Sequence, residues 1–149
     1  MNTKDFCETV YNVLKKNGLK PTIMFGRMEN EERDEMMRKF RNGEVNVIIA
    51  TDMLSRGIDV PEVDVVINFD VPTKGYKETT HGDPETYMHR IGRAGRFGQP
   101  GIALTIYDRD QDFEYLKEIL DNFKMEVKKL DSFEHFQKIY ETMYTEQII

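Results

Sequence analysis

Two short runs of β-branched residues, VNVIIA at 45–50 and VDVVINF at 63–69, most narrowly limit the fold of this chain. Runs that are apolar at nearly every position are typical of parallel strands buried on both faces. Parallel strands cannot be joined by tight turns and need crossover connections, which are usually helices. The two runs therefore predict an α/β domain with a mainly parallel sheet and helices on both of its faces.

The segments around these runs alternate between strand and helix patterns. Further strands are expected at 20–25, 101–108 and, as a short strand, 126–130. Helices are expected from about residue 6 to Gly18, and at 30–43, 83–93, 111–123 and 131–144. Apolar side chains at helical spacing should face the core: Phe6, Val10, Val13, Leu14, Met36, Met37, Phe40, Phe113, Leu116, Leu120 and Phe123. Residues 72–82 are expected to form a long loop, whose conformation the sequence does not specify.

Polar residues at the expected helix starts predict how each helix is capped. Asn30 can cap the second helix, and Asp83 can cap the third, with Pro84 at the first helical position. Asp131 and Glu134 fit a capping box at the start of the last helix.

Length and charge limit the kind of protein. At 149 residues the chain is expected to form one domain with a full core. It shows neither a signal-peptide pattern nor an apolar run near the ~18 residues of a membrane span. The single cysteine, Cys7, excludes an internal disulfide and is interpreted as a packing residue. Because the net charge is −6, any site for a polyanion must be local.

One such local site is the segment HRIGRAGRFGQPG at 89–101, where Arg90, Arg93 and Arg96 recur every third residue. Gly95 and Gly98 would let the backbone turn sharply and approach a ligand. Guanidinium groups are permanent cations that bind phosphate in a bidentate manner. The segment therefore favours phosphate chemistry; the alternative is a basic helix end that complements the helix dipole and pairs with acids.

A second polar segment, TDMLSRGIDVPEV at 51–63, directly follows a predicted buried strand. It places hydroxyls, an arginine, a glycine and acids at the carboxyl end of that strand, where ligands bind in open α/β sheets. These groups suit contacts to a phosphate backbone or a sugar. A polar turn with aspartate caps is the equally weighted alternative.

Other phosphate-binding features are missing from the sequence. It has no phosphate loop of the type GxxxxGK[ST], no DExD-like segment for Mg²⁺, and only three scattered histidines. The chain has arginines that could bind a phosphate but no loop that would hold it. This combination predicts that the chain forms half of a phosphate site and that another domain or protein supplies the other half.

Three segments in order resemble one family. FGRMENEERDEMMRKFRNG, ATDMLSRGIDVP and HRIGRAGRFG are similar to conserved segments of the second, C-terminal RecA-like domain of DEAD-box RNA helicases. The resemblance covers nearly the whole chain and implies a three-layer RecA-like domain. GDPETYMHRIGRAGRFGQPGIAL and KKLDSFEHFQKIYE resemble the nuclear-pore mRNA-export branch, with a translation-initiation helicase as the near alternative.

The resemblance implies roles in ATP hydrolysis and in contacts between domains. Arg93 and Arg96 would be catalytic arginine fingers on ATP, whose Mg²⁺ would be held by an N-terminal domain absent from residues 1–149. Gly57 and Asp59 would help to bind the nucleotide, with Asp59 on the ribose. The residues that would couple the two domains are His89, Arg90 and Arg56. This domain alone is expected to be inactive.

The resemblance also implies RNA binding and partners. Gly26, Arg33, Thr51 and Asp52 would contact the RNA backbone, so local strand separation would depend little on sequence. Partners would include the N-terminal RecA-like domain and an export activator acting with inositol hexakisphosphate. The implied location is the cytoplasm and nucleus, at the nuclear pore.

Two departures from the family pattern stand out. The chain has Phe25-Gly26-Arg27 in place of His-Gly-Asp, which could alter RNA affinity or be a solvated surface change. Only MNTK precedes the first helix, where the family has an apolar strand, so the first strand is expected to be truncated and the open sheet could promote self-association. A non-catalytic module that binds RNA or a regulator is the alternative to half of an enzyme.

Overall fold

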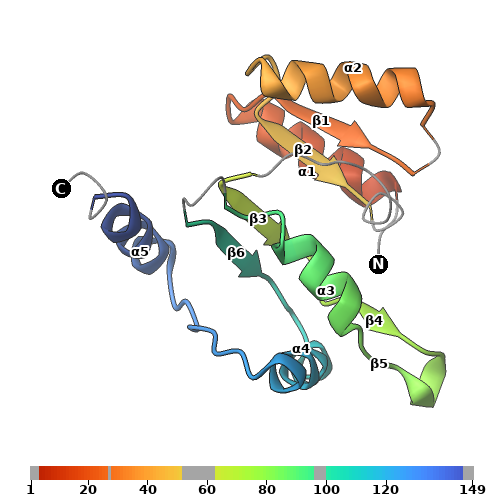
Figure 1. Cartoon of the computed structure of the whole chain (residues 1–149), viewed down its shortest axis with the longest axis vertical. Coiled ribbons are helices and arrows are strands. Elements are labelled where there is room, and N and C mark those ends of the chain that lie inside the picture. Colours follow the sequence, from red (N-terminus) through yellow and green to blue (C-terminus); the bar gives the residue numbers. More distant parts are fainter. Residues whose placement is uncertain (1–3, 27, 52–62, 96–99, 146–149) are drawn as a thin grey trace.

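The computed structural model describes residues 4–26, 28–51, 63–95 and 100–145 (Figure 1). The helices are α1 (Lys4–Lys16), α2 (Asn30–Arg41), α3 (Pro84–Ile91), α4 (Asp110–Phe123) and α5 (Phe133–Thr145), with a 3₁₀ turn, η2 (Lys77–Thr79). The strands are β1 (Pro21–Met24), β2 (Val47–Ala50), β3 (Val65–Asn68), β4 (Thr73–Lys74), β5 (His81–Gly82) and β6 (Ile102–Thr105). Within these ranges no helix is both long and apolar enough to cross a membrane.

The first half of the domain is built on a parallel pair of strands. β1 and β2 pair from Pro21 opposite Val47 to Met24 opposite Ala50. Met24 and Met37 are buried together, and Ile48 packs against them, so α2 covers one face of this pair. α1 contacts both strands, and Figure 1 shows it on the side away from α2.

The second half of the domain is also built on a parallel pair of strands. β3 and β6 pair in parallel, with Ile67 opposite Leu104. α3 contacts β3 and α4, and the buried core here is Val71, Tyr87, Leu116, Ile119 and Leu120. The region 72–82 forms a small antiparallel hairpin of β4 and β5, which lies against α4. The alternation of parallel strands and helices confirms the α/β fold class.

The prediction that the strands are buried on both faces is wrong for β2 and β3. Val47, Ile48, Ile49, Val65 and Val66 are half-buried, and Ala50 and Ile67 are exposed. Within the described residues the sheet consists of separate two-stranded pairs, so β2 and β3 each lack a neighbour on one edge.

Of the three helix caps predicted from the sequence, one is confirmed and two are wrong. Asp83 caps α3 through its side chain, which accepts from the amide of Thr86, as predicted. The residue before α2 is Glu29, and Asn30 is already helical, so Asn30 is not the cap. At α5 the Oγ of Ser132, not Asp131, accepts from the amide of His135 at 3.2 Å. Thus α2 begins one residue earlier than expected, at Asn30 itself, and α5 begins one residue later than expected, at Phe133.

Other differences concern packing. Residues 126–130 are not a strand, and Val127 is exposed, because no neighbouring strand pairs with this segment in the described part of the chain. Phe6, Val13, Phe113 and Phe123 are exposed rather than in the core. The packing interpretation of Cys7 holds: it is buried, and burial raises the pKa of its thiol.

Candidate phosphate-binding edges

The arginine segment is held by backbone hydrogen bonds where α3 ends. Val63, just ahead of β3, donates its amide to the carbonyl oxygen of Arg93 at 2.9 Å, and the amide of Gly95 donates to the carbonyl of Val63 at 2.8 Å. These two bonds form a parallel bridge between Val63 and Ala94. Arg93 is therefore attached at the amino end of β3, with its side chain half-buried.

The turn that carries Arg93 requires glycine. Gly95 has φ +103°, a conformation that residues with a side chain rarely adopt. A Cβ built on Gly101 would lie 2.1 Å from the amide nitrogen of Gly95 and 2.2 Å from the carbonyl carbon of Ala94. The start of the β6 segment therefore presses directly on the backbone that positions Arg93.

We expect Gly101→Ala to displace the arginine segment, because its methyl group would collide with backbone that cannot rotate away. Overpacking of this kind costs about 1–3 kcal/mol, or roughly 3–10 °C in Tm for a domain of this size. NMR should show shifted amide resonances for Ala94 and Gly95. Gly43→Ala is the control: Gly43 has φ +73°, unlike Gly101, but a Cβ there would meet no atom within 4 Å, so this variant should leave the Ala94 and Gly95 resonances unchanged. Unchanged Ala94 and Gly95 resonances in Gly101→Ala would contradict this account.

The two predicted interdomain residues on α3, His89 and Arg90, have different surroundings. His89 is exposed near the end of α3. The Nη1 atom of Arg90 donates to the main-chain carbonyl of Asp70 at 3.0 Å and lies 3.4 Å from its carboxylate. The Arg90 side chain is only 12% exposed. Arg90 thus ties α3 to the end of β3; the acid that follows the predicted strand was a signal for this partner, and sequence reasoning missed it.

Candidate RNA-contacting residues lie at the other end of the strands. Thr51 directly follows β2, and Gly26 follows β1 by two residues. Because β1 and β2 are parallel, both lie at the same, carboxyl edge of the sheet. In Figure 1 the arrows of β1, β2, β3 and β6 all point the same way. Thr51 and Arg93 therefore stand at opposite edges of the strands.

Arg33 lies close to this carboxyl edge. It sits in the first turn of α2, and its Nη2 donates to the carbonyl of Met28 at 3.1 Å. Its Nε is buried and has no hydrogen-bond partner within the described residues. A buried guanidinium N–H left unsatisfied is costly, so an acceptor at this point would be stabilising.

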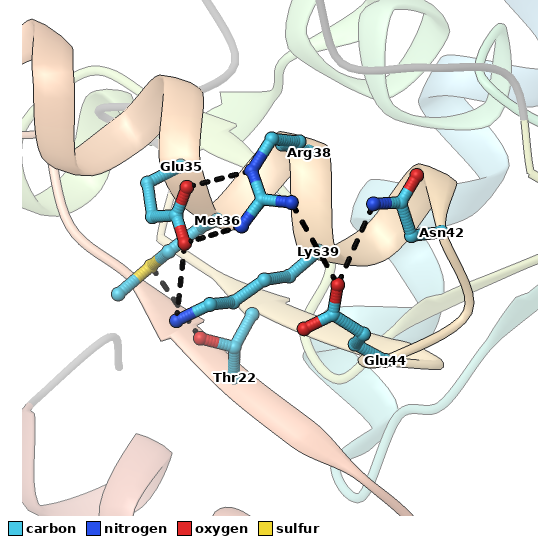
Figure 2. Close-up of polar contacts among 7 residues, drawn as sticks. All are labelled: Thr22, Glu35, Met36, Arg38, Lys39, Asn42 and Glu44. Carbon is cyan, nitrogen blue, oxygen red and sulfur yellow. Dashed lines mark hydrogen bonds and ion pairs between the residues drawn. The ribbon is translucent and has the colours of Figure 1, made fainter.

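Figure 2 shows that two other cations of α2, Arg38 and Lys39, are already paired. Arg38 makes two 2.8 Å hydrogen bonds to the Glu35 carboxylate and lies 3.8 Å from Glu44. Lys39 lies 3.4 Å from Glu35. The hydrogen bonds from Arg38 lower the pKa of Glu35 to about 2. The charge of Arg38 is thus already neutralised by carboxylates in this exposed network. Arg38 is therefore a weaker candidate than Arg33 for a phosphate contact.

Several predicted site residues lie outside the described residues: Asp52, Arg56, Gly57, Asp59 and Arg96, together with Gly98 of the predicted turn. Among the residues that are described, no group of three His, Cys, Asp or Glu side chains could hold a metal ion. The described part of the site is thus two edges that carry cations and backbone donors without metal ligands.

Comparisons with known proteins identify relatives of this chain. Residues 1–98 match the helicase conserved C-terminal domain family. The chain is 40% identical over 129 residues to the ATP-dependent RNA helicase dbp5 of Botryotinia fuckeliana, covering 86% of this chain and 27% of that protein. It is 37% identical over 140 residues to DBP5 of Saccharomyces cerevisiae, covering 92% and 28%. The chain thus spans little more than a quarter of the length of these relatives.

Solved structures show the same fold. The C-terminal domain of the DEAD-box protein Dbp5 superposes with a TM-score of 0.83 at 36% identity, covering 94% of this chain and 78% of that one. S. cerevisiae Dbp5 bound to RNA and ADP BeF3 gives 0.80 at 36% identity, covering 96% and 37%. The S. cerevisiae Dbp5 C-terminal domain bound to Gle1 and IP6 gives 0.80 at 34% identity, covering 97% and 80%. A further structure holds Dbp5 with Nup159, Gle1, IP6 and ADP.

Proposed function

Because this chain belongs to the helicase conserved C-terminal domain family, and within it to the RecA-like C-terminal domains of DEAD-box proteins, we propose that it is the second half of an ATP-dependent RNA helicase. The observation that carries this proposal is the parallel bridge between Val63 and Ala94. This bridge fixes the backbone of Arg93 at one edge of the sheet. A group that must meet a phosphate held by another domain needs such a fixed position.

ATP would bind between this chain and a first RecA-like domain, which would hold the phosphates and Mg²⁺. That metal would neutralise charge on the phosphates. Arg93, together with Arg96, would place guanidinium groups on the phosphates and stabilise the charge of the transition state. Gly57 and Asp59 would complete the nucleotide contacts from the preceding loop. Since this chain supplies no phosphate loop, it would not hydrolyse ATP alone.

The contacts between domains would use the end of α3. Arg90 is held against Asp70, so its guanidinium is already oriented before the other domain arrives. His89 is exposed beside it and free to reach an acidic group across the interface. We propose that Arg56 contributes from the loop after β2.

RNA would bind at the carboxyl edge, through Gly26, Arg33, Thr51 and Asp52. Backbone amides, a hydroxyl and a guanidinium suit phosphate oxygens, which carry no sequence information. RNA binding should therefore be insensitive to sequence and weaken with salt. ATP and RNA would thus bind at separate edges. When the two domains close, they could enclose ATP at one edge and bend an RNA strand at the other.

We place the protein in mRNA export, at the nuclear pore between nucleus and cytoplasm. Support comes from the relatives: Dbp5 structures contain RNA, Gle1 with IP6, and Nup159. We propose that this chain likewise binds an export activator together with inositol hexakisphosphate.

Thr51→Val tests the RNA edge. It removes one hydroxyl but keeps the shape of the side chain, and a hydrogen bond to a charged phosphate is worth ~1.5 kcal/mol or more. We therefore expect at least about tenfold weaker binding of single-stranded RNA by this chain mixed with its first RecA-like domain and a non-hydrolysable ATP analogue. Fluorescence anisotropy measures this directly.

Thr142→Val is the matched control, because the Thr142 hydroxyl bonds only to the carbonyl of Lys138 within α5 among the described contacts. Its RNA affinity should equal that of the unchanged chain. Equal affinities for the Thr51 and Thr142 variants would remove Thr51 from the RNA site. Binding of RNA that needs neither ATP analogue nor first domain would favour a non-catalytic module.

A further inference from the structure

The core between α2 and the first strand pair is rich in methionine. Met24 and Met37 are buried, at 1% and 4% exposure, and Met28, Met36 and Ile48 pack against them. Thioethers are flexible and polarizable, so they fill such a core well, but peroxides can oxidise them. Met28 and Met36 are only partly buried, so these two are open to an oxidant in solvent while the other two are shielded.

Met28 makes hydrogen bonds through three of its atoms. Its amide donates to the carbonyl oxygen of Phe25 at 3.2 Å, and its sulfur accepts from the amide of Phe25 at 3.3 Å. Its own carbonyl oxygen accepts from the Nη2 of Arg33 at 3.1 Å. Met28 therefore joins the residue that follows β1 to the first turn of α2.

The guanidinium of Arg33 depends on this arrangement. Among the described residues, the carbonyl of Met28 is the acceptor that holds it, and its Nε is buried without a partner. A guanidinium can donate five hydrogen bonds, so one with a single acceptor loses its fixed position when that acceptor moves. The positions of Arg33, and of Gly26 next to Phe25, are thus coupled to the position of Met28.

The sulfur of Met28 is the atom of this arrangement that a mild reagent can change. A lone pair of the thioether attacks one oxygen of a hydroperoxide, the O–O bond breaks, and the leaving oxygen takes up the proton and departs as water or an alcohol. Sulfur is oxidised to the sulfoxide and the peroxide is reduced. The new oxygen lies between the sulfur and the amide of Phe25, where a distance of 3.3 Å leaves no room for it. The polar sulfoxide is also disfavoured against the apolar side chains of Met24 and Met37.

We propose that Met28 is a site of reversible oxidation by hydroperoxides, and that its sulfoxide releases Arg33 and Phe25 from the positions they hold in this structure. The consequence for function rests on the proposed function, because Gly26 and Arg33 are two of the groups assigned to RNA. Oxidation of Met28 would weaken RNA binding, and reduction of the sulfoxide would restore it.

Met36 is the other partly buried methionine of this core, and it is less suited to such a role. Its sulfur accepts from the hydroxyl of Thr22 at 3.4 Å (Figure 2). That contact joins two side chains, and a hydroxyl can turn to another acceptor when the sulfur changes. Met36 therefore provides a matched control from the same core.

The experiment treats the full chain, Met28→Leu and Met36→Leu with hydrogen peroxide, which is then removed. Leucine keeps nearly the apolar volume of methionine but has no sulfur to oxidise. Mass spectrometry measures the sulfoxide at each methionine. NMR of the chain alone follows the Phe25 amide and the Arg33 Nε–H, with the amides of β6 as a reference for an intact fold. Fluorescence anisotropy measures RNA affinity after addition of the first RecA-like domain and a non-hydrolysable ATP analogue.

In the full chain and in Met36→Leu, we expect peroxide to shift both resonances and to weaken RNA binding about tenfold, as for one lost hydrogen bond to a charged group. Met28→Leu should keep the resonances and the affinity that it has before treatment. Methionine sulfoxide reductases A and B together should reverse the changes, since each reduces one epimer of the sulfoxide.

The proposal would be overturned by a Met28 that stays reduced while Met36 is oxidised. A Met28 sulfoxide that leaves both resonances in place would also overturn it, and so would equal effects of peroxide on Met28→Leu and the full chain. If both resonances shift but RNA affinity stays the same, the oxidation site is supported. Gly26 and Arg33 are then rejected as RNA contacts, which is a failure of the proposed function alone.

Discussion

Arg93→Ala is expected to lower RNA-stimulated ATP hydrolysis by about a thousandfold or more when this chain is combined with its first RecA-like domain. Removal of an arginine that stabilises charge during phosphoryl transfer typically costs ~10³–10⁵ in rate. The hydrogen bonds that Val63 makes to Arg93 and Gly95 join backbone atoms, so they are not lost in the variant. The effect should therefore fall on kcat, with RNA affinity nearly unchanged.

Arg38→Ala is the matched control for this variant. It also removes an arginine, but one that is exposed and paired with Glu35 and Glu44 on α2. Exposed ion pairs contribute roughly 0–1 kcal/mol, so its ATPase activity should stay within about twofold. ATPase rates that fall equally in the two variants, or that do not fall in Arg93→Ala, would reject Arg93 as a catalytic group.

Ile119→Ala should be the most destabilising of these substitutions. Ile119 has 0% exposure and lies at the centre of the cluster with Leu116 and Leu120. Replacing a buried isoleucine by alanine costs ~2–5 kcal/mol, because packing is lost and a cavity remains. For a chain of this length that corresponds to roughly 6–15 °C in Tm, measured by calorimetry.

Ile106→Ala provides the comparison, because Ile106 is 48% exposed just beyond β6. Its free energy of unfolding should fall by less than about 1 kcal/mol. If the Ile119 and Ile106 variants had the same Tm, the assignment of Ile119 to the core around α4 would be wrong.

The parts of the fold that depend on neighbouring residues could be predicted from sequence. The Asp83 cap needs only the amide three residues on, and the prediction is confirmed. Gly95 was expected at a sharp turn and has positive φ. Caps at Asn30 and Asp131 were each misplaced by one residue, since more than one polar residue lies near the start of both helices.

Features that depend on distant pairing could not be predicted from local pattern. Residues 126–130 have strand-like alternation, but a strand also needs a partner edge. The exposure of Ile67 follows from the interruption between β2 and β3, which no local pattern reports. Likewise, the placement of Thr51 and Arg93 at opposite edges depends on how α3 packs against β3. The Arg90–Asp70 contact joins residues twenty positions apart, beyond the reach of a local pattern.

The most direct test of the central claim is the ATPase rate of this chain with RNA, measured alone and after mixing with the first RecA-like domain from the same source. Half of a helicase predicts no hydrolysis by either domain alone and RNA-dependent hydrolysis by the mixture. Hydrolysis by this chain alone, or a mixture that binds RNA but never hydrolyses ATP, would contradict it.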